Sequence, residues 1–289
     1  MMPDAVHAST AVADRPEFEQ DALQMEALLL ARTYLYELAS KLLGGTPDEK
    51  VLAIAVSSTT QDVIEEFAGA SDELAAFAEF LEGLRGRDFG RLLEGSRSEH
   101  TRIFVGPAAL PASPYESPYV GNHDMALFQE NTLEVRHAYE DAGLRPRRVQ
   151  AIPDDHVAMM CSFMAAMSQH SLDSFLRGDA AALEGSLEMQ LSFSEAHMGQ
   201  WLDVFASSVR NSKAGSAAVF YPQFLEAVSA FAKADRAFLT EAAFWASNQE
   251  PFERREPAMV LADASETLDR IRDASPLGAS DFEMVSIEK

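Results

Sequence analysis

Apolar residues recur at helical spacing along most of this chain, and this periodicity limits its fold more than any other feature. In the first long segment, Leu28, Leu35 and Leu38 are separated by seven and three residues, as on the buried face of an amphipathic helix. No stretch alternates convincingly between apolar and polar residues, as a half-buried strand would. The best strand candidate, 51–56, lies among helical neighbours and is also expected to be helical. The sequence therefore predicts an all-α fold.

Glycine and proline residues divide the periodic segments and set their ends. After the helix that covers 18–43, helices are predicted at 47–56, 59–68, 71–85, 88–104, 125–142, 154–176, 179–211 and 217–248. These form a single helical-bundle domain over 17–250, in which a Pro-rich loop at 106–122 connects two parts of the bundle. Residues 1–16 are expected to be a disordered lead-in. Residues 251–289 are acidic and interrupted by proline, and are expected to form a mobile tail with at most one amphipathic helix near 257–273.

The composition excludes several classes of protein. The chain has 289 residues and a formal net charge of −23, which argues against nucleic acid as a partner and favours a basic ligand. A single cysteine, Cys161, excludes an internal disulfide and Cys-rich metal sites. No apolar run approaches the roughly 20 residues that span a bilayer, and the N-terminus lacks the apolar core of a secretory signal. We therefore expect a cytoplasmic protein without stable membrane insertion.

The loop at 106–122 reads GPAALPASPYESPYVGN and carries four of the 13 prolines. Prolines at this density cannot continue a helix, and they bias the preceding residues toward extended conformations. Tyr115 and Tyr119 lie in the same loop. A polar linker would have no need of two tyrosines, so the loop is expected to pack against another surface.

The stretch PDDH at 153–156 opens the helix predicted at 154–176. Asp154 or Asp155 is suited to cap that helix, because a carboxylate at the N-cap accepts hydrogen bonds from free N–H groups. His156 falls in the same helical stripe as the apolar Met160 and Phe163. Two interpretations stay open: a histidine and methionines that simply belong to the core, or the mouth of an adaptable apolar groove.

A metal site is an alternative interpretation of the same residues. Glu134 and His137 have the Glu-x-x-His spacing of di-iron helix bundles, and Asp155 and His156 would complete a ferritin-like set. No second Glu-x-x-His occurs among the seven histidines, which argues against it. The chain also lacks the Gly-x-Ser-x-Gly elbow of a hydrolase triad and any Gly-rich phosphate loop. We therefore expect no catalytic residues, no metal and no cofactor.

Two motifs together give a resemblance to a known family. The stretch FVGPAALPASPYESPY at 104–119 is followed about 35 residues later by PDDH, with LEVRHAYEDAGL between them. This arrangement resembles the TorD/DmsD family of molybdoenzyme chaperones, which are all-helical. The resemblance covers roughly 20–250 and is strongest at 104–156. Met160 departs from the pattern, since many members have a glutamate there, and nothing in the resemblance explains the residues beyond 250.

The resemblance implies a non-enzymatic chaperone. Such proteins bind the twin-arginine leader and the apo form of the catalytic subunit of a molybdopterin-dependent oxidoreductase, of the dimethyl-sulfoxide-reductase type, until its cofactor is inserted. By resemblance, the pair Asp155 and His156 marks the site. The remaining site residues are either matched to the loop motif or placed beside it as sources of charge and apolar surface: Gly106, Pro107, Tyr115, Glu116, Ser117, Tyr119, Asp154, Met160 and Phe163.

The residues alone are compatible with this function. Arginine pairs well with carboxylates, and Asp154, Asp155 and Glu116 would supply them. The apolar stripe and the tyrosines would accept the apolar part of a leader in a groove. Alternative functions are the ferritin-like metal-binding protein and an assembly subunit with one fixed partner. The oligomeric state is left open between a monomer and a homodimer.

Overall fold

The computed structural model describes residues 15–106, 109–120, 125–149, 151–258 and 261–287. It confirms the all-α prediction, since helices make up nearly all of its regular structure. The helices are α1 (Arg15–Gly44), α2 (Glu49–Ala55), α3 (Ser58–Ala68), α4 (Asp72–Arg85), α5 (Phe89–His100), η1 (Thr101–Val105), α6 (Ser117–Val120), α7 (Met125–Asp141), α8 (Val157–Arg177), α9 (Ala180–Phe193), η2 (Ser194–Met198), α10 (Leu202–Asn211), α11 (Lys213–Ser216), α12 (Tyr221–Ser247), α13 (Ala262–Arg272) and η3 (Ala279–Phe282). Most of the lead-in predicted at 1–16, residues 1–14, lies outside the described residues.

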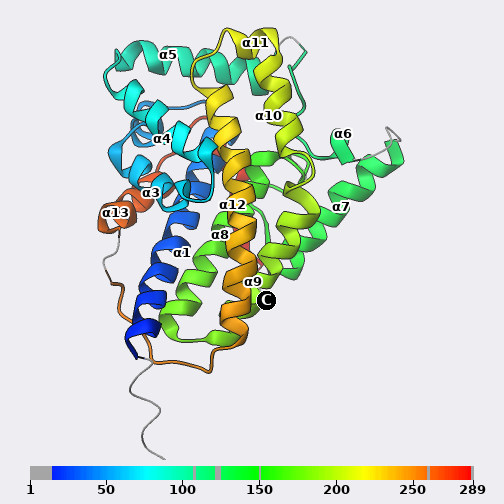
Figure 1. Ribbon diagram of the computed structural model, residues 1–289. Helices are drawn as coiled ribbons and strands as arrows, with labels where there is room; N and C mark the ends of the chain where they lie inside the picture. Colours follow the sequence, from blue (N-terminus) through cyan, green and yellow to red (C-terminus); the bar gives the residue numbers. More distant parts are fainter. Residues whose placement is uncertain (1–14, 107–108, 121–124, 150, 259–260, 288–289) are drawn as a thin grey trace, which may run out of the picture.

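The centre of the molecule is a bundle of α1, α8, α9 and α12. Helix α8 packs along α1 and against α9, and α9 packs against α12. Figure 1 shows these helices side by side, with α2 to α5 gathered at one end and α6 and α7 on the flank. Helix α8 is buried nearly all round, as expected for the central member of a bundle. None of the helices in the described part of the chain is long and apolar enough to cross a membrane.

Side-chain caps explain where many of the helices begin. The side chains of Ser57, Ser71, Asp88 and Asp179 each accept a hydrogen bond from the backbone N–H three residues later, at the starts of α3, α4, α5 and α9. Helix α12 is capped from a distant part of the sequence. The buried Glu99 carboxylate on α5 accepts hydrogen bonds from the N–H groups of residues 219, 220 and 221, at 2.6, 2.9 and 3.0 Å. This contact ties the peripheral helices to the central bundle.

The single helix predicted at 179–211 is wrong, because the structure divides it into α9, the π-helical turn η2 and α10. The break falls at Gly199 and Trp201. Trp201 is fully buried, and its indole N–H donates to the carbonyl of His197 at 2.6 Å. A Cβ atom at Gly199 would collide with the Arg236 guanidinium of α12. Tertiary packing, which the helical periodicity does not record, therefore redirects the chain here.

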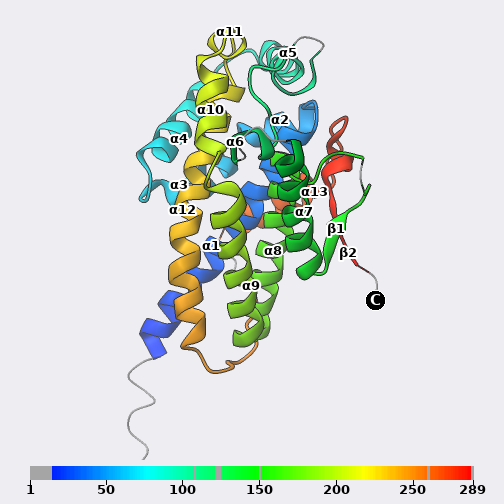
Figure 2. The same cartoon turned by 90° about the vertical axis from the view of Figure 1, so that its right-hand side faces the viewer.

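The described residues of the C-terminal segment, for which the sequence predicts a mobile tail with one amphipathic helix near 257–273, pack onto the bundle in the structure and include the helix α13. Helix α13 packs against α1 and α3. Strand β2 (Met284–Ser286) then pairs in antiparallel fashion with β1 (Leu144–Pro146), beside α7 (Figure 2). These two strands are three residues long, too short to show a period-two pattern in the sequence. The segment is acidic overall, but three of its apolar side chains, Leu268, Ile271 and Phe282, are buried.

A buried polar network joins three helices of the bundle. Arg32 on α1 forms an ion pair with Asp235 on α12, and both side chains are fully buried. Arg32 also donates to Gln190 on α9 at 2.7 Å, and the Tyr36 hydroxyl donates to Asp235 at 2.7 Å. A buried charge that loses its partner destabilises a fold strongly, so this network favours one arrangement of α1, α9 and α12 over others.

Replacing Asp235 with asparagine is expected to lower the free energy of unfolding by about 3–5 kcal/mol, because the buried Arg32 charge loses its counter-ion. Urea denaturation followed by circular dichroism measures this. The exposed Asp62 on α3 is the matched control, and its replacement with asparagine should change little. A loss below about 1 kcal/mol for the Asp235 variant would show that the pair does not stabilise the bundle.

Candidate binding site at the start of helix 8

The two sequence motifs, far apart in the chain, meet directly at the start of α8. The backbone N–H of Glu116 donates to the carbonyl of Asp155 at 3.1 Å, and the N–H of Val157 donates to the carbonyl of Pro114 at 2.9 Å. Tyr115 and His156 form an isolated antiparallel bridge between these bonds. The Pro-rich loop therefore pairs with the PDDH segment as a short ladder. This ladder brings Tyr115, Glu116, Ser117, Asp154, Asp155 and His156 together.

Asp155 fastens the loop through its side chain. One carboxylate oxygen accepts hydrogen bonds from the backbone N–H of Ser117, at 3.0 Å, and from the Ser117 hydroxyl. Ser117 is the first residue of α6, so Asp155 acts as a cap for that short helix. Both side chains are buried. The contact between the two motifs therefore holds the loop on the bundle and also forms a candidate site.

Asp154 faces α7 instead. Its carboxylate accepts from the Arg136 guanidinium at 2.7 Å and 2.5 Å, through Nε and Nη2. The Tyr139 hydroxyl donates to the Asp154 carbonyl at 2.9 Å. Burial raises the pKa of the Asp154 carboxyl, and the Arg136 charge opposes that rise. Arg136 lies within the Glu-x-x-His stretch, which the sequence suggested only as part of a metal site.

Glu116 is fully buried and reaches a part of the chain that the sequence did not connect to the site. Its carboxylate lies 3.2 Å from Nδ1 of His197, in the turn η2. Burial raises the pKa of Glu116, the His197 contact opposes the rise, and the nearby Asp155 charge adds to it. His197 is 81 residues away in sequence and lies in η2, just before the break between α9 and α10. No local pattern identifies such a partner.

Three carboxylate oxygens of this cluster have no hydrogen-bond partner among the described residues. They are Oε1 of Glu116, Oδ1 of Asp154 and Oδ1 of Asp155, and all three atoms are buried. An unsatisfied buried acceptor costs free energy, and the cost is larger for a charged group. Arg136 is the one arginine that contacts the cluster in the described structure. The cluster therefore has both spare acceptors and spare negative charge, which suits a cationic ligand with several N–H donors.

His156, and neither of the aspartates, is the N-cap of α8. Its Nδ1 accepts a hydrogen bond from the N–H of Ala158 at 3.1 Å. The prediction that Asp154 or Asp155 caps this helix is therefore wrong. The two carboxylates face other partners: Asp154 accepts from the charged Arg136, and Asp155 accepts from the N–H and the hydroxyl of Ser117. The His156 ring lies between Tyr115 and Phe282, with ring centroids 4.9 and 4.5 Å away.

Met160 and Phe163 belong to the core. Both are fully buried, and the Phe163 ring packs 4.5 Å from Phe193 and 4.8 Å from Tyr139. At Met160 and Phe163 the proposed apolar groove is therefore closed, because both side chains are packed inside the protein. The core interpretation of the methionine stripe accounts for these two residues.

The other residues of the loop motif lie at the edge of the cluster or beyond it. The half-buried Tyr119 donates to the Ser113 carbonyl at 2.8 Å and stacks on Trp201 at 5.4 Å. Gly106 ends the turn η1 with φ of 95°, a conformation that favours glycine. It borders a separate cavity of about 510 Å³ with Thr101 and Arg102. Pro107 lies outside the described residues.

The structure does not gather the four residues of the metal-site alternative. Glu134 and His137 are exposed on α7, whereas Asp155 and His156 are buried at the start of α8. Within the described ranges, no group of three or more His, Cys, Asp or Glu side chains is arranged to hold a metal ion.

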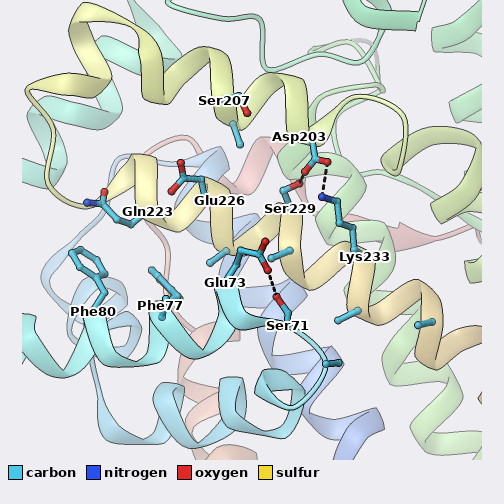
Figure 3. A pocket seen from close by; sticks show the side chains of 17 residues that line it. Ser71, Glu73, Phe77, Phe80, Asp203, Ser207, Gln223, Glu226, Ser229 and Lys233 are labelled. Carbon is cyan, nitrogen blue, oxygen red and sulfur yellow. Dashed lines mark hydrogen bonds and ion pairs between the residues drawn. The ribbon is translucent and has the colours of Figure 1, made fainter.

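A second cavity, of about 580 Å³, lies between α4, α10 and α12 (Figure 3). Phe77 and Phe80 form its apolar wall. Much of its charge is already paired, because Lys233 contacts Asp203 at 2.5 Å and Ser71 donates to Glu73 at 2.8 Å. None of the site residues predicted from the sequence lines it. The ionisable site residues predicted from the sequence therefore lie at the start of α8 and not at this cavity.

The fold and the site together define an all-helical protein in which a Pro-rich loop is joined to an Asp-His pair at the start of a central helix. Comparison with known proteins agrees with this class. Residues 64–207 match the family described as nitrate reductase delta subunit. The chain is 24% identical over 213 residues to the chaperone protein TorD of Shewanella sp. strain ANA-3, which covers 73% of this chain and 95% of the relative. It is 25% identical over 219 residues to TorD of Shewanella oneidensis, covering 73% and 91%. The chain belongs to the TorD/DmsD family.

The burial of His156 predicts sensitivity to acid. Burial, with a smaller effect of His100, lowers the pKa of His156 from 6.5 to about 3. The unfolded chain then binds a proton that the folded chain does not, so stability is present above pH 6.5 and is lost as pH falls from there toward 3. Between pH 7 and pH 5 the loss from this histidine is about 2 kcal/mol.

Replacing His156 with asparagine, which also caps helices well, should remove that part of the acid sensitivity. Urea denaturation of the wild type and the variant at pH 7 and pH 5 provides the measurement. The drop in unfolding free energy should be smaller in the variant by about 2 kcal/mol. Equal drops in the two proteins would show that His156 does not titrate between its folded and unfolded states in this range.

Proposed function

We propose that this protein is a cytoplasmic chaperone that binds the twin-arginine leader of a molybdopterin-dependent oxidoreductase and holds the apo form of its catalytic subunit during cofactor insertion. The observation that carries the proposal is the cluster of Glu116, Asp154 and Asp155. Each of these buried carboxylates has one oxygen without a hydrogen-bond partner among the described residues. The bound ligand supplies the missing donors.

Arginine is the side chain that fits these acceptors best. A guanidinium group carries five N–H donors in a planar fork and pairs with two carboxylate oxygens at once. Arg136 already contacts one carboxylate oxygen of Asp154 through two of its nitrogens, so the cluster is suited to guanidinium groups. The chain has a net charge of −23, which attracts a basic peptide over a distance.

The loop offers apolar surface for the part of the leader that follows the arginines. Tyr115 and Tyr119 are half-buried at the rim of the cluster, and aromatic side chains of this kind provide contact area at low entropic cost. Met160 and Phe163 stay behind them as support in the core. The leader therefore meets the rim tyrosines and the carboxylates, and does not lie along the methionine stripe.

The family supports the type of client. The relatives compared above are named chaperones, and the family description names a nitrate reductase, which is an oxidoreductase. We carry both properties to this chain: a chaperone activity, and an oxidoreductase of the dimethyl-sulfoxide-reductase type as client. The proposed activity is binding and needs no catalytic group.

Replacing Glu116 with glutamine should weaken binding of a synthetic twin-arginine leader by about ten- to a hundredfold, since one charge-assisted contact contributes roughly 1.5–3 kcal/mol. Isothermal titration calorimetry measures the affinity. The exposed Glu188 on α9 serves as the control, and its glutamine variant has the same change in charge. If both variants bind the leader like the wild type and keep its helicity, Glu116 is not part of the leader site.

A leader in which both arginines are replaced by lysines separates the charge of the pair from its shape. Lysine keeps the charge but lacks the planar fork, so this peptide should dissociate faster even at low salt. Raising the salt from 0.1 to 1 M shortens the Debye length from about 10 to about 3 Å, so the association rate should fall for both peptides. Stopped-flow fluorescence gives both rates. Equal rates for the two peptides would mean that the carboxylates attract the leader without recognising arginine.

A further inference from the structure

Residues 279–287, which we term the strap, reach the candidate site at His156. Phe282 of the strap is 6% exposed and its ring lies 4.5 Å from the His156 ring. On its other side the Phe282 ring packs closely over Gly44, where a Cβ atom would lie only 2.6 Å from it. Phe282 thus fills a seat between the end of α1 and the start of α8. In this position it contacts His156, whose ring also contacts Tyr115.

The strap is attached to the body of the protein along its whole length. Strand β2 pairs with β1, with Leu144 opposite Ser286 and Pro146 opposite Met284. The N–H of Met284 also donates to the Ser162 hydroxyl at 3.2 Å. These bonds hold residues 284–286 as a strand beside α8, after the 3₁₀ helix η3 at 279–282. This part of the strap resembles a peptide added to a sheet edge.

Charge contributes to the attachment. The strap carries Asp281 and Glu283, which face a basic group formed by Lys41, Arg147 and Arg148. Arg148 contacts Asp281 at 2.6 Å, and Glu283 contacts Arg147 at 2.9 Å and Lys41 at 3.3 Å. The guanidinium groups of Arg147 and Arg148 are more than half exposed, so their ion pairs are screened by salt and each is weak, whereas the Lys41 side chain is buried.

We propose that the strap is a detachable lid on the leader site, and that the leader binds after the strap has left its seat. This inference rests on the proposed function, because it assigns regulation to the same site. It has two supports in the geometry. Phe282 of the strap contacts His156 within the motif that forms the site, and outside the Phe282 seat the strap is held mainly by a short two-stranded ladder and by ion pairs with the exposed Arg147 and Arg148.

The strap lowers the apparent affinity for the leader because only the open fraction of the protein binds. When the binding-competent state is a fraction of the population, the apparent dissociation constant is the intrinsic one divided by that fraction. Weakening the strap should therefore tighten leader binding, and fixing it in place should weaken leader binding. An ordinary structural segment would show neither effect.

A reversible disulfide tests the closed state. Leu144 and Ser286 are opposite each other in the ladder. The single natural cysteine, Cys161, is buried and therefore should not react with the oxidant in the folded protein. The double variant Leu144→Cys and Ser286→Cys, when oxidised, should bind the synthetic twin-arginine leader at least about tenfold more weakly than after reduction by dithiothreitol. Equal affinity in the oxidised and reduced forms overturns the proposal.

A charge reversal tests the open state. Glu283→Lys places a positive charge against Lys41 and Arg147 and leaves the Phe282 seat unaltered, so it should tighten leader binding by about tenfold. The matched control is Glu79→Lys, an equal change in charge at an exposed position on α4. Unchanged or weaker binding in the Glu283 variant, relative to the control, argues that the strap is a fixed part of the fold.

Hydrogen exchange of the wild-type protein gives an independent reading. Addition of the leader should speed amide exchange in residues 279–287, although bound ligands normally slow exchange near their sites. If the leader binds but exchange in these residues is slower or unchanged, the lid proposal is refuted and the proposed function stands. If the leader binds neither the wild type, nor the reduced double variant, nor Glu283→Lys, the proposed function fails, and the strap proposal fails with it.

Discussion

The buried ion pair between Arg32 and Asp235 fixes the frame on which the rest of the molecule is built. It joins α1 to α12, and the bond from Arg32 to Gln190 adds α9. Helix α8 packs between α1 and α9, so its position follows from theirs. Because the candidate site is built on the first residues of α8, the polar network in the core determines where the loop, α7 and the strap converge.

The site itself combines a structural role with spare binding capacity. One oxygen of Asp155 holds Ser117, and one oxygen of Asp154 holds Arg136, while the second oxygen of each is buried without a hydrogen-bond partner in the described structure. Burial raises the pKa of Asp154 and of Glu116. A fold that keeps such groups stores an unfavourable electrostatic free energy that a cationic ligand relieves on binding.

Several features of the fold and the site were predictable from the sequence because they depend on neighbouring residues. Helical periodicity and capping residues gave the all-α class and most helix positions, including α2, whose apolar run also resembled a strand. The two motifs identified the loop and the PDDH segment as one site, and the structure joins them by backbone hydrogen bonds. The partners of Glu116 and Asp154 were missed, since His197 and Arg136 reach the site from other helices.

By itself, the sequence determined that the chain is helical, acidic and divided by a Pro-rich loop, because periodicity, charge and proline act locally. The tertiary structure decided which ionisable groups face one another. It made His156 the helix cap, whereas the carboxylates of Asp154 and Asp155 bind Arg136 and Ser117. It placed Phe282 against His156, although 126 residues of chain separate them. Contacts of this kind depend on how the helices pack, and local sequence patterns carry no record of that packing.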